Sequence, residues 1–487
     1  MPKAPQPLEI ARGSANDDPA SEHARALLEA TGSTVLPGLG SNSDAATAPL
    51  TQYAAESWAA SGAMTLSGES DQPPRFAATP LAIAAIGAGR AIEALRPARP
   101  GSIDWGALLA ERAALVGHTR KGRISAGGAA RLLETGDGWI AVQLPRPDDW
   151  QLVPAWLEID LPTELFERDA GWALIDEHLR MRVTKDVLDR GRMIGLALAE
   201  AERVRRPGVP VYQLHNPNEA SPIEGRVRVL DLTSLWAGPL ATSLLLDAGC
   251  DVLKVEASGR PDGARSGPAP FFDLMNYGKR SVALDLHQAK DRDYFERLLE
   301  VADVVVESAR PRSLAQLGYE ANAWCSARDG RLWTSITGYG RAHEWIAFGD
   351  DAAIAAGLAW PPALEGTHPA SPTFCGDAIA DPLTGIHAAA LMLGLLRNGR
   401  GGLLELSLRD VVASTASIEA GALVAPLERD VNGRWVVQRD GGPIVPVAAP
   451  RARKLRGSAP RLTQPTDAAL VDWCEDRSVS PRGARRC

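Results

Sequence analysis

The stretch 372–387, PTFCGDAIADPLTGIH, places a carboxylate where charge is costly. Asp381 stands between small residues and the turn-like segment 382–385, and the apolar run AAALMLGLL follows. A carboxylate in such surroundings loses hydration, which indicates either a structural bond or chemistry. Asp before Pro is also a favourable helix N-cap, so the residues alone leave both roles open. Cys375 is a second nucleophile candidate; with no His or Asn partner evident, a small buried residue is the favoured interpretation.

The composition is that of an ordinary globular protein. The 487 residues are 45% hydrophobic and 23% charged, and the net charge of -8 argues against nucleic acid as the main partner. No apolar run approaches the ~20 residues that span a membrane, and the N-terminus shows no secretory h-region. Five scattered cysteines and eight unclustered histidines give no reason to expect disulfides or a metal. We therefore expect a cytoplasmic protein that binds no metal.

The N-terminal half has a mixed pattern. Residues 1–50 predict a partly ordered leader with one helix near residues 20–31. Beyond it we expect the following elements: Ala-rich helices over 53–95, an amphipathic helix over 105–117, a hairpin over 130–144, further helices over 148–158 and 164–201, and a short strand over 209–212. The polar segment 215–224 predicts a linker, which we place at a domain boundary.

The C-terminal half alternates strands and helices. Strands are predicted over 226–232, 251–256, 280–286, 303–308 and 332–340, and a helix over 289–301. This pattern predicts a parallel, doubly wound sheet with ligands at the carboxyl ends of its strands. Basic residues lie in the loops that follow those strands and close to them. They could bind phosphate groups or could equally be solvated surface residues: Arg265, Lys279, Arg280, Arg310, Arg312 and Arg341. Glu256 suits a ribose-binding acid, but no G-x-G-x-x-G precedes it.

Five motifs occur in order: GRVRVLDLTSLWAGPLATSLLLDAGCDVLKVEASGRPDGAR, NYGKRSVALDL, ADVVVESARP, TSITGYG, and DAIADPLTGIHAAALMLGLL with RNGRGGLLELSL. Together they cover about residues 222–420, and the set resembles the family III CoA-transferases, the CaiB/BaiF family. The resemblance implies a Rossmann-like doubly wound parallel sheet with a smaller α+β domain. It also implies a homodimer that moves CoA from an acyl-CoA to a carboxylic acid.

The resemblance assigns roles to particular residues. Asp381 falls on the family's nucleophile, which passes through an acyl anhydride and an aspartyl-CoA thioester. The turn of Ala237, Gly238 and Pro239 is implied to approach CoA closely. The implied phosphate ligands are Arg265, Lys279 and Arg310. CoA enters as part of the substrate, and no metal is implied.

Two other readings stay open. Family racemases use a His-Asp pair, but Asp350 stands where their histidine would, and His343 lies seven residues upstream. The segment 58–95 echoes 352–396 without an aspartate at the nucleophile position, which suggests a catalytically empty partial copy and keeps a silent CoA-binding protein possible. The Gly-rich residues 125–128 are either a turn or a loop over the nucleophile.

The expected division of the chain follows from these segments. Residues 1–50 form the leader, and 51–215 form a degenerate, small-domain-like family III half. Residues 222–425 form the Rossmann-like CoA-binding domain with the catalytic Asp, and 426–487 form a partly disordered C-terminal segment. We expect the N-terminal piece to complete the active site carried by the C-terminal piece.

Overall fold

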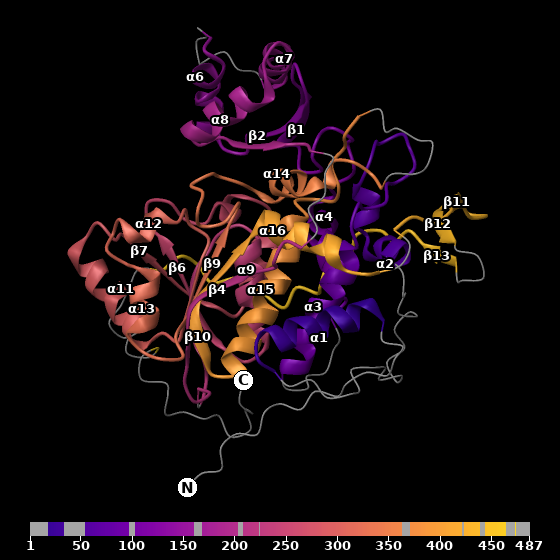
Figure 1. Cartoon of the computed structure of the whole chain (residues 1–487). Helices are drawn as coiled ribbons and strands as arrows, with labels where there is room; N and C mark the ends of the chain where they lie inside the picture. The colour runs from indigo at the N-terminus through magenta and orange to yellow at the C-terminus, as the bar shows by residue number, and fades with distance from the viewer. Residues whose placement is uncertain are drawn as a thin grey trace.

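The computed structural model describes residues 18–33, 54–96, 103–159, 168–202, 208–223, 225–362, 371–420, 423–438, 444–463 and 473. Most of the predicted leader and most of the chain after residue 463 therefore lie outside the described residues. Within these ranges the fold is mixed α/β and is built around a largely parallel sheet (Figure 1). The fold class is thus confirmed at this level. No helix in the same ranges has both the length and the apolarity needed to cross a membrane.

The central sheet has seven strands in the order β4-β10-β9-β8-β5-β6-β7. All neighbours are parallel except the edge pair β4 and β10. The carboxyl ends of the parallel strands consequently share one edge of the sheet, where ligands of α/β proteins bind. The strands are β4 (Gln213–Glu219), β5 (Arg228–Leu232), β6 (Asp251–Ala257), β7 (Arg280–Leu284), β8 (Val304–Glu307), β9 (Leu332–Thr337) and β10 (Arg400–Ser407).

Helices cover both faces of this sheet. Successive residues of a strand point to opposite sides, so its apolar side chains reach both faces and each face needs a cover. Val229 joins the core on the side of α9 and α15, whereas Leu230 joins the core on the side of α11 and α13. Figure 1 shows the two helix layers on either side of the strands. The helices of this half are α9 (Ala237–Asp247), α10 (Ala269–Asn276), α11 (Ala289–Val301), α12 (Arg312–Ala315), α13 (Ala321–Ser326), α14 (Gly349–Ala353), α15 (Ala380–Arg397) and α16 (Leu408–Ser414).

The N-terminal residues contribute two pieces. Helices α1 (Pro19–Ala30), α2 (Ala54–Ser61) and α3 (Leu81–Leu95) share one hydrophobic core with α9 and α15. The second piece is a small lobe that lies above α14 in Figure 1, and α4 (Glu111–Val116) connects the two. The lobe contains β1 (Ala130–Glu134), β2 (Trp139–Gln143), β3 (Ala197–Glu200), α5 (Pro147–Gln151), α6 (Val153–Leu157), α7 (Arg168–Leu179) and α8 (Thr184–Ile194).

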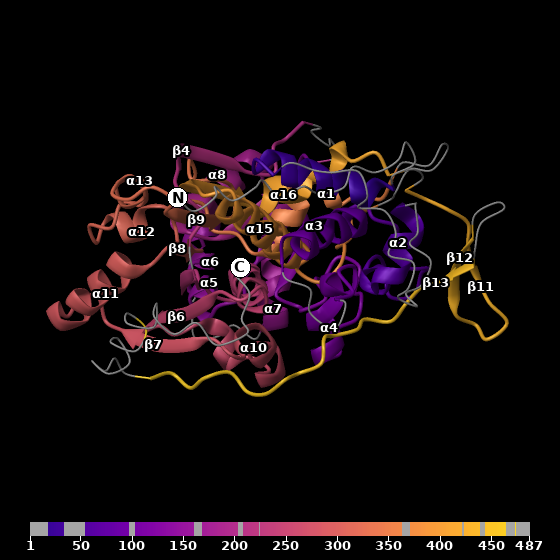
Figure 2. The same ribbon diagram turned by 90° about the horizontal axis from the view of Figure 1, so that it is seen from below.

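The described C-terminal residues run back along the molecule. After the small sheet of β11 (Leu427–Arg429), β12 (Trp435–Gln438) and β13 (Ile444–Pro446), residues 447–463 form an extended strap, seen along the lower edge of Figure 2. Arg453 of the strap pairs with Glu111 of α4 at 2.9 Å, and the carbonyl of Thr463 accepts a hydrogen bond from the Ala283 N–H of β7. The strap therefore joins the N-terminal helices to the central sheet.

Several sequence predictions were wrong in detail. Residues 209–212 are not a strand; the strand is β4, which begins at Gln213 and extends into the segment 215–224 that was predicted as a polar linker. An edge strand gains its hydrogen bonds from the backbone, so its side chains can stay polar and exposed, and hydropathy does not reveal it. The predicted helix 105–117 is divided into a 3-10 turn (Ala107–Ala110) and α4, and the predicted helical region 164–201 ends in β3. The hairpin is confirmed, with β1 and β2 antiparallel.

Candidate active site

Asp381 lies in the first turn of α15, the helix that occupies the core beside α9. The N-cap of α15 is Ile379, so of the two roles that the residues left open for Asp381, the structure does not show the N-cap. A carboxylate in the first turn of a helix interacts favourably with the helix dipole. Pro382 follows it within that turn, where the missing N–H of proline costs no intrahelical bond. Almost every later residue of α15 is buried, which fixes the position of this turn.

The backbone around Asp381 is tight and strained. A Cβ atom added to Gly349, the first residue of α14, would lie 2.2 Å from Oδ2 of Asp381. Ala378 and Leu235 both have positive φ values, 46° and 68°, that non-glycine residues rarely adopt. The Ala378 N–H donates to Oδ1 of Asp350 at 2.8 Å, which holds the turn before α15 against α14. Strain of this kind is concentrated at functional sites.

The carboxylate of Asp381 has an unusual electrostatic environment. Its side chain is partly accessible, but surrounding protein desolvates it and raises its pKa to about 7. The positive charge of Arg112 opposes this rise, as does a hydrogen bond from the Ala237 N–H, while the charge of Asp350 adds to it. The pKa of buried Asp350 is itself raised to about 6, mainly by desolvation. Asp381 can therefore exchange its proton near neutral pH.

Two cavities meet at Asp381, and Leu235 and Phe348 also line both of them. The first, here called the strand-end cavity, has a volume of about 140 Å³ and lies at the carboxyl ends of β5, β8 and β9. Its wall includes Ala237 and Gly238, which begin α9, and the exposed Arg310 after β8. A helix N-terminus together with a cation is suited to phosphate groups.

The second cavity, here called the apolar cavity, has a volume of about 280 Å³. The N-terminal residues supply much of its wall, including Arg112, Val116 and His118. The guanidinium of Arg112 binds both oxygens of Asp377 at 2.9 and 2.5 Å and lies over the Trp236 ring at 4.9 Å. Within the described chain, residues from both halves thus line one space beside Asp381.

Asp377 connects this cluster to the loop before α15. Its side chain is fully buried, and Nδ1 of His118 lies 3.2 Å from Oδ2. Burial would raise the pKa of Asp377, but the charge and hydrogen bonds of Arg112, with His118, hold it below its usual range. Asp377 is therefore ionised at neutral pH and anchors Arg112 in place.

N-terminal residues also hold the loop that precedes Asp381. The Arg75 guanidinium donates to the carbonyls of Leu358, Ala359 and Thr373. The hydroxyl of Ser67 accepts a hydrogen bond from the Gly376 N–H at 2.9 Å. Because these contacts fix the approach to α15, the N-terminal half positions the nucleophile candidate as well as lining its cavity.

The predicted CoA-contacting residues occupy different environments. Ala237, Gly238 and Arg310 line the strand-end cavity, whereas Pro239 is behind it, with its carbonyl accepting a hydrogen bond from Lys279. The Arg265 side chain is 21% exposed and pairs with Glu256 at 2.6 Å. Glu256 is thus engaged by an ion pair, which explains its place at the end of β6 without a ribose.

The position of Lys279 does not fit its predicted role as a phosphate ligand. Its side chain is fully buried, and Nζ donates to Asp231 at 2.9 Å and to Thr242 and Asn276. Desolvation lowers its pKa to about 8, against the charge of Asp231. Because all of these partners lie in the protein interior, the Lys279 ammonium is not placed to bind a phosphate.

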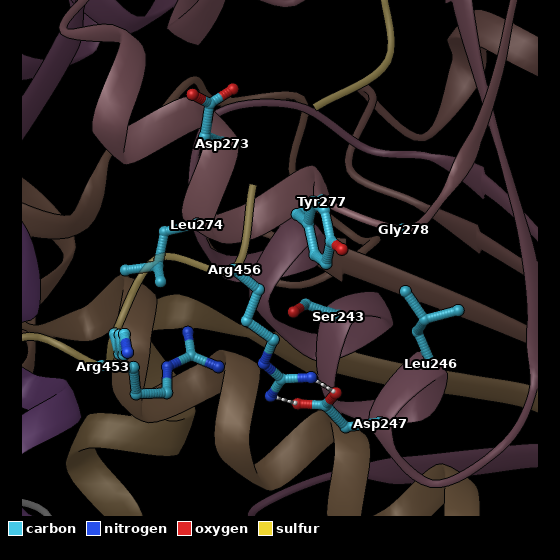
Figure 3. Close-up of a pocket in the computed structure, with 10 residues that line it drawn as sticks. Ser243, Leu246, Asp247, Asp273, Leu274, Tyr277, Gly278, Arg453 and Arg456 are labelled. Atoms are coloured by element: carbon cyan, nitrogen blue, oxygen red, sulfur yellow. Dashed lines mark hydrogen bonds and ion pairs between the residues drawn. The ribbon is translucent and has the colours of Figure 1, made fainter. Parts of the chain in front are cut away.

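The alternative nucleophile does not fit either. Burial raises the pKa of the Cys375 thiol, and its Sγ lies 3.8 Å from the Ser67 hydroxyl. A protonated, buried thiol is a poor nucleophile. Another cavity, between α9, α10 and the strap, lies apart from Asp381; Figure 3 shows it with the ion pair of Arg456 and Asp247. Among the described residues no group of three or more His, Cys, Asp or Glu side chains is arranged to hold a metal ion.

Sequence reasoning missed Arg112, His118 and Asp377. Arg112 and Asp377 are separated by 265 positions in the chain, and no motif links them. The available signal was the position of Asp377 within GDAIAD, four residues before the expected nucleophile. Asp350 was noted only as a replacement for histidine, and the structure places it on the wall of the apolar cavity.

Comparison with known proteins agrees with the resemblance found in the motifs. Residues 225–435 match the model of CoA-transferase family III. A succinate–glutarate CoA-transferase of Agrobacterium fabrum is 30% identical over 40% of this chain and 53% of its own length. A succinyl-CoA:glutarate CoA-transferase of Mus musculus is 32% identical over 47% of this chain and 54% of its own. A crystal structure of a hypothetical protein from Mycobacterium tuberculosis aligns with a TM-score of 0.38 at 28% identity, over 45% of this chain and 65% of that one.

The family III match begins near β5 and ends at β12, so it includes the parallel strands, α9, α15 and Asp381. The chain spans about half the length of these two curated relatives. The similarity to CoA-transferase family III therefore concerns residues 225–435, the segment that carries Asp381.

Proposed function

We propose that this protein is a CoA-transferase that moves CoA from an acyl-CoA to a carboxylic acid, with Asp381 as the nucleophile. The observation that carries the proposal is the position of Asp381: a partly accessible carboxylate at the junction of two cavities, beside the first turn of α9. The family III match over the same residues supports it. The raised pKa also supports it, since a less hydrated carboxylate is a stronger nucleophile when ionised.

The proposed reaction has four steps. One oxygen of Asp381 attacks the thioester carbonyl; the C–S bond breaks, giving an acyl anhydride and CoA thiolate. The thiolate attacks the Asp381 carbonyl, which forms an aspartyl-CoA thioester and releases the donor acid with one oxygen of Asp381. The acceptor carboxylate then attacks this thioester, forming a second anhydride and freeing the thiolate. Finally, the thiolate attacks the acceptor carbonyl, and Asp381 regains an oxygen from the acceptor.

Neighbouring residues support these steps in the proposal. Arg112 keeps Asp381 ionised in a fraction of the molecules near neutral pH, because the charge of Arg112 lowers the pKa of Asp381. Ala237, Gly238 and Arg310 bind the CoA portion in the strand-end cavity. The apolar cavity receives the acyl group, and Gly349 leaves room for the carboxylate to reach it.

Trapping of the enzyme-bound acyl group tests this proposal. The protein is incubated with acyl-CoA esters and then with hydroxylamine, which converts an activated aspartyl carbonyl into a hydroxamate that peptide mass spectrometry locates. We expect the hydroxamate at Asp381 and its loss in Asp381→Asn. Asp351→Asn is the matched control, because buried Asp351 binds the Tyr339 hydroxyl and lines neither cavity in the described structure. Modification elsewhere, or persistence in Asp381→Asn, would overturn the proposal.

A second candidate, an acyl-CoA racemase or isomerase, is favoured by one observation. Asp350 and Asp381 line the same cavity, and their pKa values are raised to about 6 and about 7, so both can exchange a proton near neutral pH. Incubation of a 2-methylacyl-CoA in deuterated water separates the two functions. Deuterium at the α-carbon, lost in Asp350→Asn, supports the racemase; its absence with hydroxamate formation supports the transferase.

We further propose that the seven-stranded sheet forms a Rossmann-like CoA-binding unit and that the N-terminal half is a degenerate partial family III copy. The contacts of Arg75 and Arg112 with the loop before α15 support a role of this half in completing the site. A homodimer is the expected assembly. Light scattering tests it, with the mass of a monomer as the contradicting result.

A further inference from the structure

Apart from Asp381, the charged and amide side chains of the apolar cavity already have hydrogen-bond partners. Arg112 is held by both oxygens of Asp377, and Oδ1 of Asp350 accepts the Ala378 N–H. Gln143 uses its side-chain oxygen to accept the Asp351 N–H at 3.2 Å. Among the described residues of this wall, the only basic side chains are those of Arg112 and His118, and both contact Asp377. No cation of the described wall is left to neutralise a carboxylate at the far end of a substrate.

The rest of the wall is apolar. It includes one short aliphatic side chain from α4, a tryptophan and two phenylalanines, and a proline before α10: Val116, Trp236, Phe271, Phe348 and Pro268. Such a lining favours an alkyl or aromatic group, because burial of apolar surface supplies the binding energy. It penalises a second carboxylate, which would lose its hydration without gaining a cationic partner.

We propose that the apolar cavity selects monocarboxylic acids with an alkyl or aromatic body and rejects dicarboxylic acids. The inference rests on the proposed function, because it assigns the acyl group to this cavity. Two acidic neighbours strengthen the rejection. Asp350 and Asp381 line the cavity, and their negative charge, when ionised, repels the distal carboxylate of a dicarboxylic substrate.

Butyryl-CoA and succinyl-CoA form a matched pair for the test, since both acyl groups have four carbons and only one carries a distal carboxylate. The rate of hydroxamate formation at Asp381 is measured for each ester, and the dissociation constants are measured by calorimetry with Asp381→Asn. We expect at least a tenfold preference for butyryl-CoA in both measurements, equal to about 1.4 kcal/mol. Equal or tighter binding of succinyl-CoA overturns the inference.

The two measurements separate this inference from the function on which it rests. A tenfold binding preference without any hydroxamate refutes the transferase mechanism and leaves the selectivity of the cavity standing. Hydroxamate formation at equal rates, with equal dissociation constants, supports the transferase and refutes the selectivity.

Introducing a cation provides the complementary variant. Val116 is half-buried at the end of α4, so Val116→Lys places an ammonium group at the wall with room to reach water. We expect the preference for butyryl-CoA to fall at least tenfold, while Val116→Met retains it. Ala129→Lys, at a half-buried position of the same wall, repeats the test if Val116→Lys does not fold. An unchanged preference in a folded lysine variant contradicts the inference.

Discussion

Replacing Arg112 by methionine should shift the pH dependence of the reaction to higher pH. The positive charge of Arg112 is the strongest influence that lowers the pKa of Asp381 against desolvation. Without it the carboxylate anion is less stable, so the pKa rises from about 7. A rise of one unit corresponds to about 1.4 kcal/mol, and at pH 7 it reduces the ionised fraction from about one half to about one tenth. We therefore expect activity at pH 7 to fall about fivefold and to recover near pH 9.

The substitution should also destabilise the protein. Arg112 is only 24% exposed, and its partner Asp377 is fully buried. Removing one member of such a pair leaves an unpaired buried charge, and typically costs about 3–5 kcal/mol. Urea unfolding measures this cost, and it establishes the conditions under which the variant is folded during the kinetic assay.

The assay is the hydroxamate-forming rate as a function of pH, expressed as kcat/KM. Its midpoint belongs to the coupled carboxylates, so the direction of the shift is the informative quantity. Asp377→Asn provides the matched control, because the charge of Asp377 raises the pKa of Asp381. Its midpoint should move to lower pH. A midpoint that stays constant or moves to lower pH in folded Arg112→Met would refute the electrostatic account of the site.

Three further predictions concern positions around the site and in the core. Gly349→Ala should reduce hydroxamate formation more than tenfold, since its Cβ would overlap Asp381, while Gly259→Ala, with nothing within 4 Å, should not; equal rates would refute this. Lys279→Met should lower the free energy of unfolding by about 3 kcal/mol but leave the CoA dissociation constant of the folded protein unchanged; weaker CoA binding would restore its predicted role. Burial lowers the pKa of His387 to about 4, below its unfolded value of about 6.5, so its contribution to stability is complete above pH 6.5 and lost as the pH falls. Urea unfolding at pH 7 and 5 should show a loss that is about 2 kcal/mol smaller in His387→Leu than in the wild type. Neighbouring His23, whose pKa burial lowers to about 3, keeps its own loss in the variant, and an equal loss in the two proteins would contradict the assignment.

The parallel strands were predictable because buried strands of this type consist of continuous apolar residues. Residues 303–308 and 332–340 predicted β8 and β9, and the predicted helix 289–301 coincides with α11. The strand β4 escaped prediction because its side chains are polar and its stability comes from backbone pairing with β10. Hydropathy reports burial of side chains and carries little information about edge strands.

The site was predictable only in part. The position of Asp381 followed from the family resemblance, whereas Arg112 and His118 lie in the half of the chain to which the five motifs do not extend. Their contacts with Asp377 arise from tertiary packing, which no local spacing encodes. For Lys279 the motif suggested a contact that the structure does not show. A lysine in this motif was expected to bind a ligand, but its side chain is buried and pairs with Asp231 on β5.

Isotope transfer provides the most direct test of the central claim that Asp381 forms covalent intermediates with both acids. The enzyme turns over with an acyl-CoA donor and an acceptor acid whose carboxylate carries ¹⁸O, and the peptide containing Asp381 is then analysed by mass spectrometry. The proposed steps return one acceptor oxygen to Asp381, so this peptide should gain a heavy oxygen. Product formation with no heavy oxygen in that peptide would contradict the account.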